Sequence, residues 1–149
     1  MDTQHDTGRD AAPERDTSRR LLFRNTMRIA PGHSNEFRQA IEDAVGFAEQ
    51  HAPQLMVDVF IDDEHQTATS FQIYRDSKAV LRHWELSDPY IAKVMEHCTV
   101  AKFEVFGSPS DEVRNGFGKM SDIAVTMQPR LTGYLKLDGA ESHGGGVQP

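Results

Sequence analysis

The strongest constraint on the fold of this chain is a switch in hydrophobic period near its beginning. Over residues 21–29, apolar side chains recur at alternate positions, the spacing of a half-buried strand. Pro31 ends this strand. Ser34 then suits an N-cap, and the helix that follows should end near Ala52, because Pro53 disfavours helical geometry in the residue before it. The apolar stripe of this helix, at spacings of three and four, is Phe37, Ala40, Ile41, Ala44, Val45 and Ala48.

Further predicted strands and helices follow along the chain. The next predicted elements are a strand over residues 55–61, a strand over 67–74, a helix over 77–86, a further helix from 88 to about 98, and a strand over 99–106. Asp88 and Pro89 should restart the second of these helices as its N-cap and first helical residue. The order βαββαβ over residues 21–107 predicts the α+β class and a ferredoxin-like sandwich.

The two ends of the chain differ from this middle. Residues 1–20 and 138–149 are polar or glycine-rich without periodicity, so we expect two disordered tails. Between the sandwich and the second tail, residues 108–137 should form a C-terminal arm: a short helix over 108–116, a strand over 123–127 and a strand over 131–137. This arm is too small to fold alone, and it should lie on the same domain or on a neighbouring subunit.

Charge and cysteine content exclude several classes of protein. The net charge of -7 leaves no basic surface for a phosphate backbone, so we expect no nucleic-acid partner. Cys98, the one cysteine, cannot form an internal disulfide, and no His or Cys spacing suggests a metal site. No stretch approaches the ~18 apolar residues of a membrane span, and the acidic N-terminal segment does not resemble a secretory signal. We therefore expect a cytoplasmic protein without a membrane partner.

Both faces of the predicted sheet carry apolar side chains. One set is Phe23, Met27, Val57, Val59, Phe71, Ile73, Phe103 and Val105, and the opposite set is Leu22, Met56, Phe60, Tyr74, Val100 and Phe106. The two helices of a ferredoxin-like sandwich cover only one face of the sheet, so the second face needs another cover. A second copy of the same sheet would supply it and give a two-fold homodimer. The alternative is that the arm folds back over its own sheet.

Asn25 and Trp84 are the first candidates for chemistry. Asn25 shares its strand face with apolar residues, and a buried amide must be hydrogen-bonded, either to backbone at a bulge or to a ligand in a cavity. Trp84 lies in the apolar stripe of its helix, where plain core packing is the simpler interpretation. If the two side chains meet, they place two donors in a dry space, as needed to hold a developing oxyanion.

Three further polar side chains lie at the edges of the helical stripes. Tyr90 and His97 share one edge, where His97 could act as a base and Tyr90 could donate a hydrogen bond, although each also suits a solvated boundary position. His83 flanks Trp84 on the other side. The sequence contains no Gly-rich phosphate loop and no GxSxG elbow, so it does not support flavin or nicotinamide binding.

Short motifs resemble the antibiotic biosynthesis monooxygenase family. They are SKAVLRHWELSDPYI at residues 77–91, the strand SFQIYRD before it, and PGHSNEFRQAI after the first strand. The resemblance covers about residues 23–107. It implies ferredoxin-like protomers paired sheet to sheet into a dimeric α/β barrel, and oxidation of an aromatic phenol, quinol or polyketide-like substrate by O2 without a cofactor. Such chemistry requires only a dry cavity, a base and oxyanion donors.

The resemblance also assigns roles to particular residues. The catalytic candidates are Asn25, Trp84, His97 and Tyr90, and the residues expected to contact substrate are Phe23, Met27, His83 and Val94. A haem-degrading branch of the superfamily has an Asn and a Trp at matching places, but its iron-ligating His falls where this chain has Val94, with His97 three residues later. Haem binding or degradation is therefore the first alternative, and a non-catalytic dimeric module that binds a small molecule is the second.

Overall fold

The computed structural model describes residues 19–120 and 122–136. The elements are β1 (Leu21–Ile29), α2 (Ser34–His51), β2 (Met56–Asp62), β3 (Thr67–Tyr74), α3 (Ser77–Met95), β4 (Cys98–Phe106), α4 (Asp111–Gly118) and β5 (Val125–Gln128). The predicted βαββαβ order is confirmed. The predicted tails, residues 1–20 and 138–149, fall outside the described residues except for residues 19 and 20.

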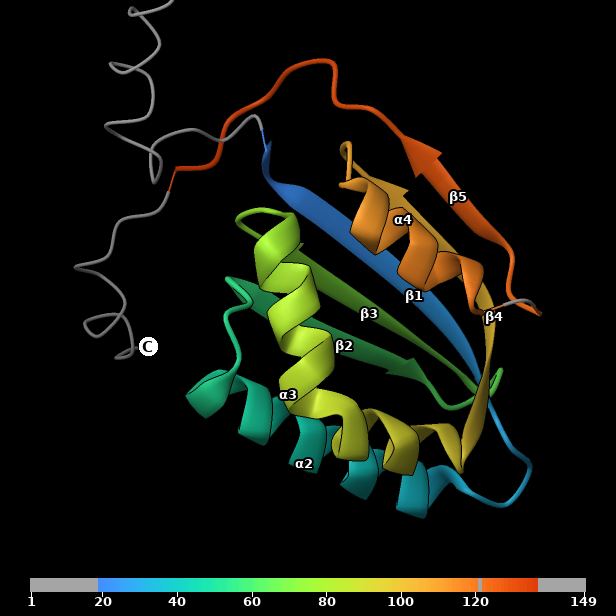
Figure 1. Ribbon diagram of the computed structural model, residues 1–149. Helices are drawn as coiled ribbons and strands as arrows, with labels where there is room; N and C mark the ends of the chain where they lie inside the picture. Colours follow the sequence, from blue (N-terminus) through green and yellow to red (C-terminus); the bar gives the residue numbers. More distant parts are fainter. Residues whose placement is uncertain (1–18, 121, 137–149) are drawn as a thin grey trace, which may run out of the picture.

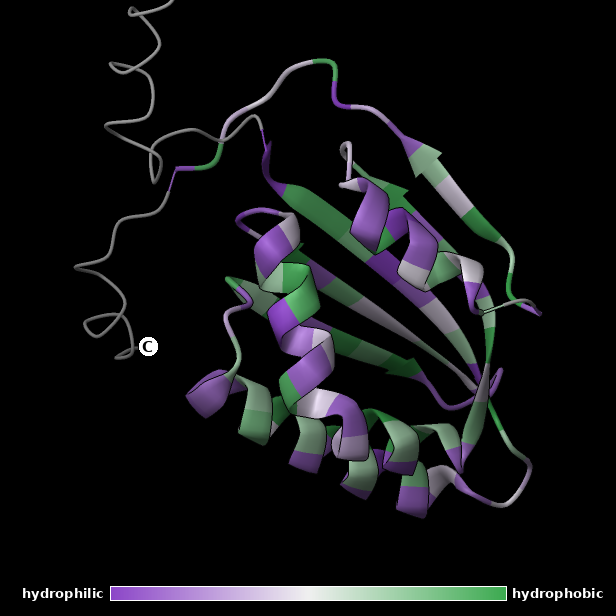
Figure 2. Cartoon of the chain, in the orientation of Figure 1, coloured by the Kyte–Doolittle hydropathy of each residue, from purple (hydrophilic) through white to green (hydrophobic). Residues whose placement is uncertain are grey.

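The strands form one open sheet in the order β2-β3-β1-β4-β5. The first four strands pair antiparallel as in the ferredoxin-like fold, and β5 adds to the edge of β4 in parallel. Helices α2, α3 and α4 lie on one face of the sheet (Figure 1). Hydrophilic and hydrophobic residues alternate along α2 and α3 (Figure 2), as expected of helices that bury one side. The α+β ferredoxin-like class is confirmed.

Two apolar clusters fill the space between helices and sheet. The first, beneath α4 and the beginning of α3, centres on Phe23, Tyr74, Val80, Phe103 and Phe117. The second, between α2, the end of α3 and the far end of β1, centres on Met27, Ile29, Phe37, Ala40, Val94 and Cys98. The sandwich therefore has two separate centres of packing.

Helix α3 runs without interruption through Pro89, so the prediction of two separate helices is wrong. Figure 1 shows that the helix bends in its middle instead. Pro lacks the N–H that would bond to the preceding turn and its ring crowds the carbonyl there, which bends a helix whose two halves are each held by packing. The N-cap is Asp76, whose carboxylate accepts a hydrogen bond from the Ala79 N–H at 3.0 Å.

The inward face of β3 differs from the prediction. Tyr74 points toward the helices, is fully buried and packs on Phe23 with ring centroids 4.8 Å apart. Because side chains alternate along a strand, Ser70 and Gln72 also face the helices, whereas Phe71 and Ile73 lie on the outer face. The sequence prediction placed Phe71 and Ile73 on the same face as Phe23 and Met27, and in fact Ser70 and Gln72 occupy that face.

The C-terminal arm follows the prediction only at first. Helix α4 is capped by the Ser110 hydroxyl, which accepts a hydrogen bond from the Val113 N–H, and β5 joins the sheet. Residues 131–136 form no strand, because β5 is a four-residue edge and the chain turns at Gly133, which has a positive φ of 155°. The arm borders a hollow with Leu22 and Phe106 at one end of the outer sheet face, and Leu131 remains 94% exposed.

Within the described ranges, no helix combines the length and the apolar character needed to cross a bilayer. Over the same residues, His, Cys, Asp and Glu side chains nowhere gather in a group of three or more that could hold a metal ion.

Candidate functional site

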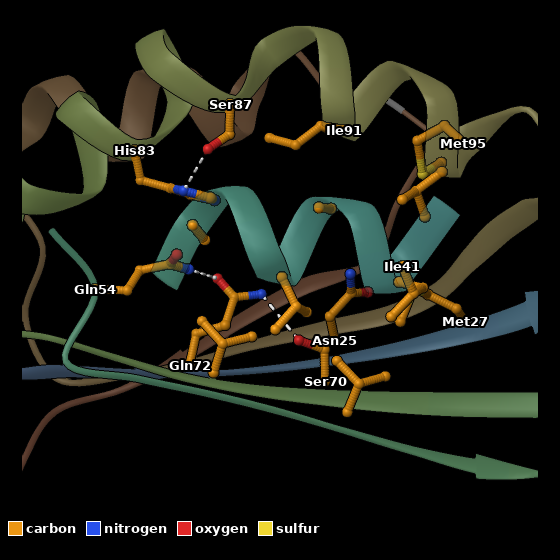
Figure 3. A pocket seen from close by; sticks show the side chains of 16 residues that line it. Asn25, Met27, Ile41, Gln54, Ser70, Gln72, His83, Ser87, Ile91 and Met95 are labelled. Atoms are coloured by element: carbon orange, nitrogen blue, oxygen red, sulfur yellow. Dashed lines mark hydrogen bonds between the residues drawn. The ribbon is translucent and has the colours of Figure 1, made fainter. Parts of the chain in front are cut away.

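A pocket lies between the sheet, α2 and the bend of α3 (Figure 3). Its volume is about 120 Å³, a little less than the ~150 Å³ of an engineered apolar cavity that accepts benzene. Ten of the sixteen lining side chains are aliphatic or thioether groups. The six polar ones are Asn25, Gln54, Ser70, Gln72, His83 and Ser87. The pocket is thus an apolar space for about one aromatic ring, with a few polar groups facing it.

The pocket continues toward the outside between α2 and the start of β2. A second hollow of about 460 Å³ shares Val45, Ala48, Gln54 and Val57 with it and adds Glu49, Leu55 and Met56. Small-molecule sites usually measure ~300–1,000 Å³, so the inner pocket alone is too small for this range, whereas the outer hollow reaches it. A ligand larger than one ring would place its remainder in this outer hollow.

Asn25 rises from the centre of β1 into the pocket, as the sequence predicted (Figure 3). Its Cα partner across the sheet is Ser70 of β3. The Asn25 Oδ1 atom is buried without a hydrogen-bond partner among the described residues. No hydrogen bond to a described residue holds this amide, so its Nδ2 can donate to a ligand in the pocket.

A hydrogen-bonded chain of side chains runs along the inward face of β3. The Tyr74 hydroxyl donates to Gln72 Oε1 at 2.5 Å, and Gln54 Nε2 donates to Gln72 Oε1 at 3.1 Å and to Tyr74 Oη at 2.9 Å. Gln72 Nε2 in turn donates to Ser70 Oγ at 3.1 Å (Figure 3). Burial raises the pKa of Tyr74 well above its usual value, so the phenol remains protonated and continues to donate.

His83 enters the pocket from the first half of α3 (Figure 3). Its Nδ1 and the buried Ser87 hydroxyl, one turn later, hydrogen-bond at 3.0 Å. Burial disfavours the imidazolium and lowers the pKa of His83 to about 4. The ring is therefore neutral near pH 7, and when Nδ1 carries the proton toward Ser87, Nε2 is left as a base.

Trp84 does not line this pocket, so it does not meet Asn25 there and the simpler interpretation of core packing applies to it. Its indole packs against α4 instead, edge-to-face with Phe117 at a centroid distance of 5.3 Å. A Cβ built on Gly116 would come within 2.4 Å of the same indole. The position one residue after His83 turns Trp84 by about 100° around the helix, away from the pocket and onto the first apolar cluster.

The other predicted residues divide between the pocket and the remaining core. Met27, His83 and Val94 line the pocket, whereas Phe23 is buried in the first cluster. Tyr90 stacks on Phe47 of α2, with centroids 4.4 Å apart.

His97 lies beyond the end of α3, outside the pocket, where its Nδ1 is 3.0 Å from the Nδ1 of His33. The four catalytic candidates therefore do not converge. Asn25 alone of that set faces the pocket.

Four polar residues of the pocket were missed by sequence reasoning: Gln54, Ser70, Gln72 and Ser87. A signal for two of them existed, because Ser70 and Gln72 share a parity with buried Ala68 and Tyr74 in β3. Polar residues at inward positions of a strand require partners or a ligand. No comparable pattern marks Gln54, which lies in the loop between α2 and β2.

The residues of the pocket do not fit a haem. Val94, at the position matching the iron ligand of the haem-degrading branch, has no donor atom, and His97 lies outside the pocket beside His33. A cavity of about 120 Å³ holds about one small ring rather than a porphyrin.

Comparison with solved structures shows which proteins share this fold. MupZ from Pseudomonas fluorescens matches with a TM-score of 0.62 and 13% identity, over 78% of this chain and 95% of its own. SnoaB from Streptomyces nogalater, a cofactor-independent oxygenase, matches with a TM-score of 0.52 and 14% identity, over 61% and 94% of the two chains. A Caulobacter crescentus protein provisionally assigned to the antibiotic biosynthesis monooxygenases gives 0.52 and 14%, over 60% and 87%.

These matches show that the chain has the ferredoxin-like fold found in the antibiotic biosynthesis monooxygenases. The resemblance that we inferred from the sequence motifs is therefore confirmed at the level of the fold. The match to MupZ extends over more of the chain than β1 to β4 accounts for. No protein-family model matches the sequence, and no curated protein matches it.

Proposed function

We propose that the protein is a cofactor-independent monooxygenase that oxidises an aromatic phenol, quinol or polyketide-like substrate with O2 in the pocket between sheet and helices. The observation that carries the proposal is the joint presence of a neutral imidazole, His83, and an unfixed amide, Asn25, in an otherwise apolar pocket the size of one ring. SnoaB, which shares the fold, is named a cofactor-independent oxygenase, and this supports the same class of activity.

The chemistry follows from these two groups. A phenolic ring enters the inner pocket, and the larger part of a polycyclic substrate occupies the outer hollow. His83 Nε2 accepts the proton that activates the substrate, and Asn25 Nδ2 donates a hydrogen bond to the resulting oxyanion. The electron-rich anion then reduces O2 directly. For a methylene activated by an adjacent phenolic ring, the CH2 becomes C=O, one oxygen atom is inserted and the other leaves as water.

The apolar lining contributes to this reaction. When a bound substrate fills the apolar pocket and displaces water, a hydrogen bond to the oxyanion is stronger than in solution, and side reactions of the reduced oxygen intermediate with water are suppressed. The neutral state of His83 also matters, since a cationic imidazolium has no lone pair with which to accept a proton.

Oxygen consumption with a panel of hydroquinones and anthrones tests the proposal. His83→Gln should lower the rate by a factor of ~10²–10⁴, the usual contribution of a general base. Asn25→Ala should lower it by ~10²–10³, the usual contribution of one oxyanion donor. His65→Gln, on an exposed turn, is the matched control for His83 and should leave the rate unchanged.

Equal oxygen uptake by the wild type and by His83→Gln would refute the assigned base. Tight binding of the panel without any oxygen uptake would favour the alternative of a non-catalytic binding module.

We further propose that the outer face of the sheet pairs with a second copy of the chain, which would give the two-fold dimer. Phe60 is 58% exposed there and borders a hollow with Phe71. Arg24 donates to both carboxylate oxygens of Glu104 on this face at 2.6 and 2.7 Å, and Lys102 lies 3.5 Å from the same carboxylate. A second sheet can therefore cover Glu104 without leaving its charge unpaired.

Light scattering after size exclusion tests the dimer. The wild type should elute with twice the mass of one chain, and Phe60→Lys should shift the equilibrium toward the monomer while the thermal transition of the fold is retained. A wild type that remains monomeric at every concentration would contradict the pairing.

A further inference from the structure

Two polar side chains stand next to each other on the floor of the pocket. Asn25 and Ser70 are direct cross-strand partners of β1 and β3, and both face the helices. Directly opposed residues on one face of an antiparallel pair have Cβ atoms ~4.5–5.5 Å apart. Apart from Gln72, which follows Ser70 on the same face of β3, the side chains around this pair on the floor are apolar: Met27, Val57 and Val59.

The direction of the Ser70 hydroxyl follows from the side chains beyond it. Gln72 Oε1 accepts hydrogen bonds from Tyr74 and Gln54, so the amide of Gln72 must turn its Nε2 toward Ser70. Ser70 Oγ then accepts from Gln72 Nε2 at 3.1 Å and keeps its own proton for another acceptor. Within the described part of the chain, no side chain or carbonyl accepts that proton, and no hydrogen bond joins Ser70 to Asn25.

We propose that Ser70 is a catalytic residue that donates its hydroxyl proton to the same substrate oxygen as Asn25 Nδ2, and that Gln72 and Tyr74 are positioning residues that orient this hydroxyl. This inference rests on the proposed oxygenase function, and it names the second oxyanion donor that the reaction needs. The two donors come from neighbouring strands, so a single substrate oxygen between them can receive both hydrogen bonds.

The position of Ser70 supports a role beyond packing. Ser70 lies in the middle of β3 with only 5% of the residue exposed, so its hydroxyl is removed from bulk water. The hydrogen-bonded chain is also directional: each group from Tyr74 to Ser70 accepts from the one before it and donates to the next. In a low-dielectric pocket such a chain polarises its members and strengthens the last donor.

The pKa of a bound phenol measures the two donors without any oxygen chemistry. The probe is 4-nitrophenol, whose phenolate absorbs visible light, titrated spectroscopically in the absence of O2. Hydrogen bonds to the phenolate should lower its pKa on the wild-type protein relative to variants that lack one of the donors. Ser70→Ala should weaken deprotonation of the bound probe about tenfold, which corresponds to about one pKa unit for one hydrogen bond to an anion.

Three further variants separate a donor role from a structural one. Gln72→Leu removes the Nε2 donor without adding a charge, so the Ser70 hydroxyl is no longer oriented and deprotonation of the bound probe should weaken in the same direction as in Ser70→Ala. Tyr74→Phe should give a smaller change in the same direction. Ser70→Thr retains a hydroxyl and should restore the wild-type value, and the exposed control His65→Gln should not differ from wild type.

The outcomes distinguish this inference from the proposed function. An unchanged pKa of the bound probe in Ser70→Ala, or a failure of Ser70→Thr to restore it, overturns the role of Ser70 even when oxygen consumption is observed. A pKa that depends on Ser70 as described supports the donor role, and an absence of oxygen uptake with every substrate then counts against the proposed function alone. If 4-nitrophenol does not bind the wild type, both proposals are wrong.

Discussion

Gly116→Ala provides a sharp test of where Trp84 lies. Gly116 is inside α4, and a Cβ at this position would lie 2.4 Å from Cζ3 and 3.0 Å from Cη2 of Trp84. Normal contacts between carbon atoms are ~3.5–4.0 Å, so the indole has to move by about 1 Å within a packed cluster. Overpacking of this kind costs ~1–3 kcal/mol. It opposes the ~1 kcal/mol that Ala gains over Gly in a helix.

A double-mutant cycle isolates the contact. Gly116→Ala should lower the free energy of unfolding in the wild type, and in a Trp84→Phe background it should be neutral or stabilising, because the smaller ring leaves room for the methyl group. The coupling between the two substitutions should be ~1–3 kcal/mol. Urea denaturation followed by circular dichroism measures it, with the slope of the transition held equal among the variants.

Gly46→Ala is the matched control, since nothing lies within 4 Å of the added Cβ at this position in α2. It should stabilise the protein by about 0.5–1 kcal/mol. If Gly116→Ala stabilises the protein as much as Gly46→Ala does, Trp84 does not pack on α4 and the pocket must be reconsidered with the indole inside it.

Three further predictions concern titrating groups. The pKa of His83 is lowered to about 4, so as the pH falls the unfolded chain binds a proton before the folded chain does, and the free energy of unfolding should decrease between about pH 6.5 and 4. His83→Gln should make this decrease smaller when it is measured by urea denaturation at each pH. The same pH dependence in both proteins would argue against burial of the ring. The hydrogen bond from Arg24 holds the pKa of Glu104 below its usual value, so the stabilising effect of this pair is present at neutral pH and is lost in acid. Glu104→Gln should lower the free energy of unfolding at pH 7 and make it less dependent on acid pH. Identical acid-unfolding transitions in the two proteins would show that the pair contributes nothing. Burial raises the pKa of the Cys98 thiol to about 11, so a thiol-reactive dye at pH 8 should label this cysteine only after unfolding, and rapid labelling of the native protein would contradict its position in the second cluster.

Much of the fold follows from local patterns in the sequence. The strand β1 and the helix α2 were predicted within a residue or two, because a period of two and a period of 3.6 are both unambiguous over nine or more residues. The break at Pro89 was not predicted correctly. Local rules favour a new helix there, and packing of both halves of α3 against separate partners overrides them.

The site was less predictable than the fold. Asn25, Met27, His83 and Val94 could be found because each is unusual or central in a simple periodic pattern. The direction in which Trp84 points depends on its contact with α4, and this helix lies outside the βαββαβ unit. No short-range pattern in the sequence reveals that α4 packs against α3. The inward parity of β3 was missed because its apolar residues, Phe71 and Ile73, face outward.

Helix α3 covers the pocket, and its bend divides the helix into two halves. His83 and Ser87 belong to the half anchored on the cluster beneath α4, and Ile91, Val94 and Met95 belong to the half anchored on α2. Each half of α3 packs on its own set of buried side chains. The turn that contains Pro89 lacks one backbone hydrogen bond that would otherwise hold the two halves in one straight helix. Substitutions around this bend can therefore change the shape of the pocket while both apolar clusters stay intact, so the same fold can accommodate pockets of different width.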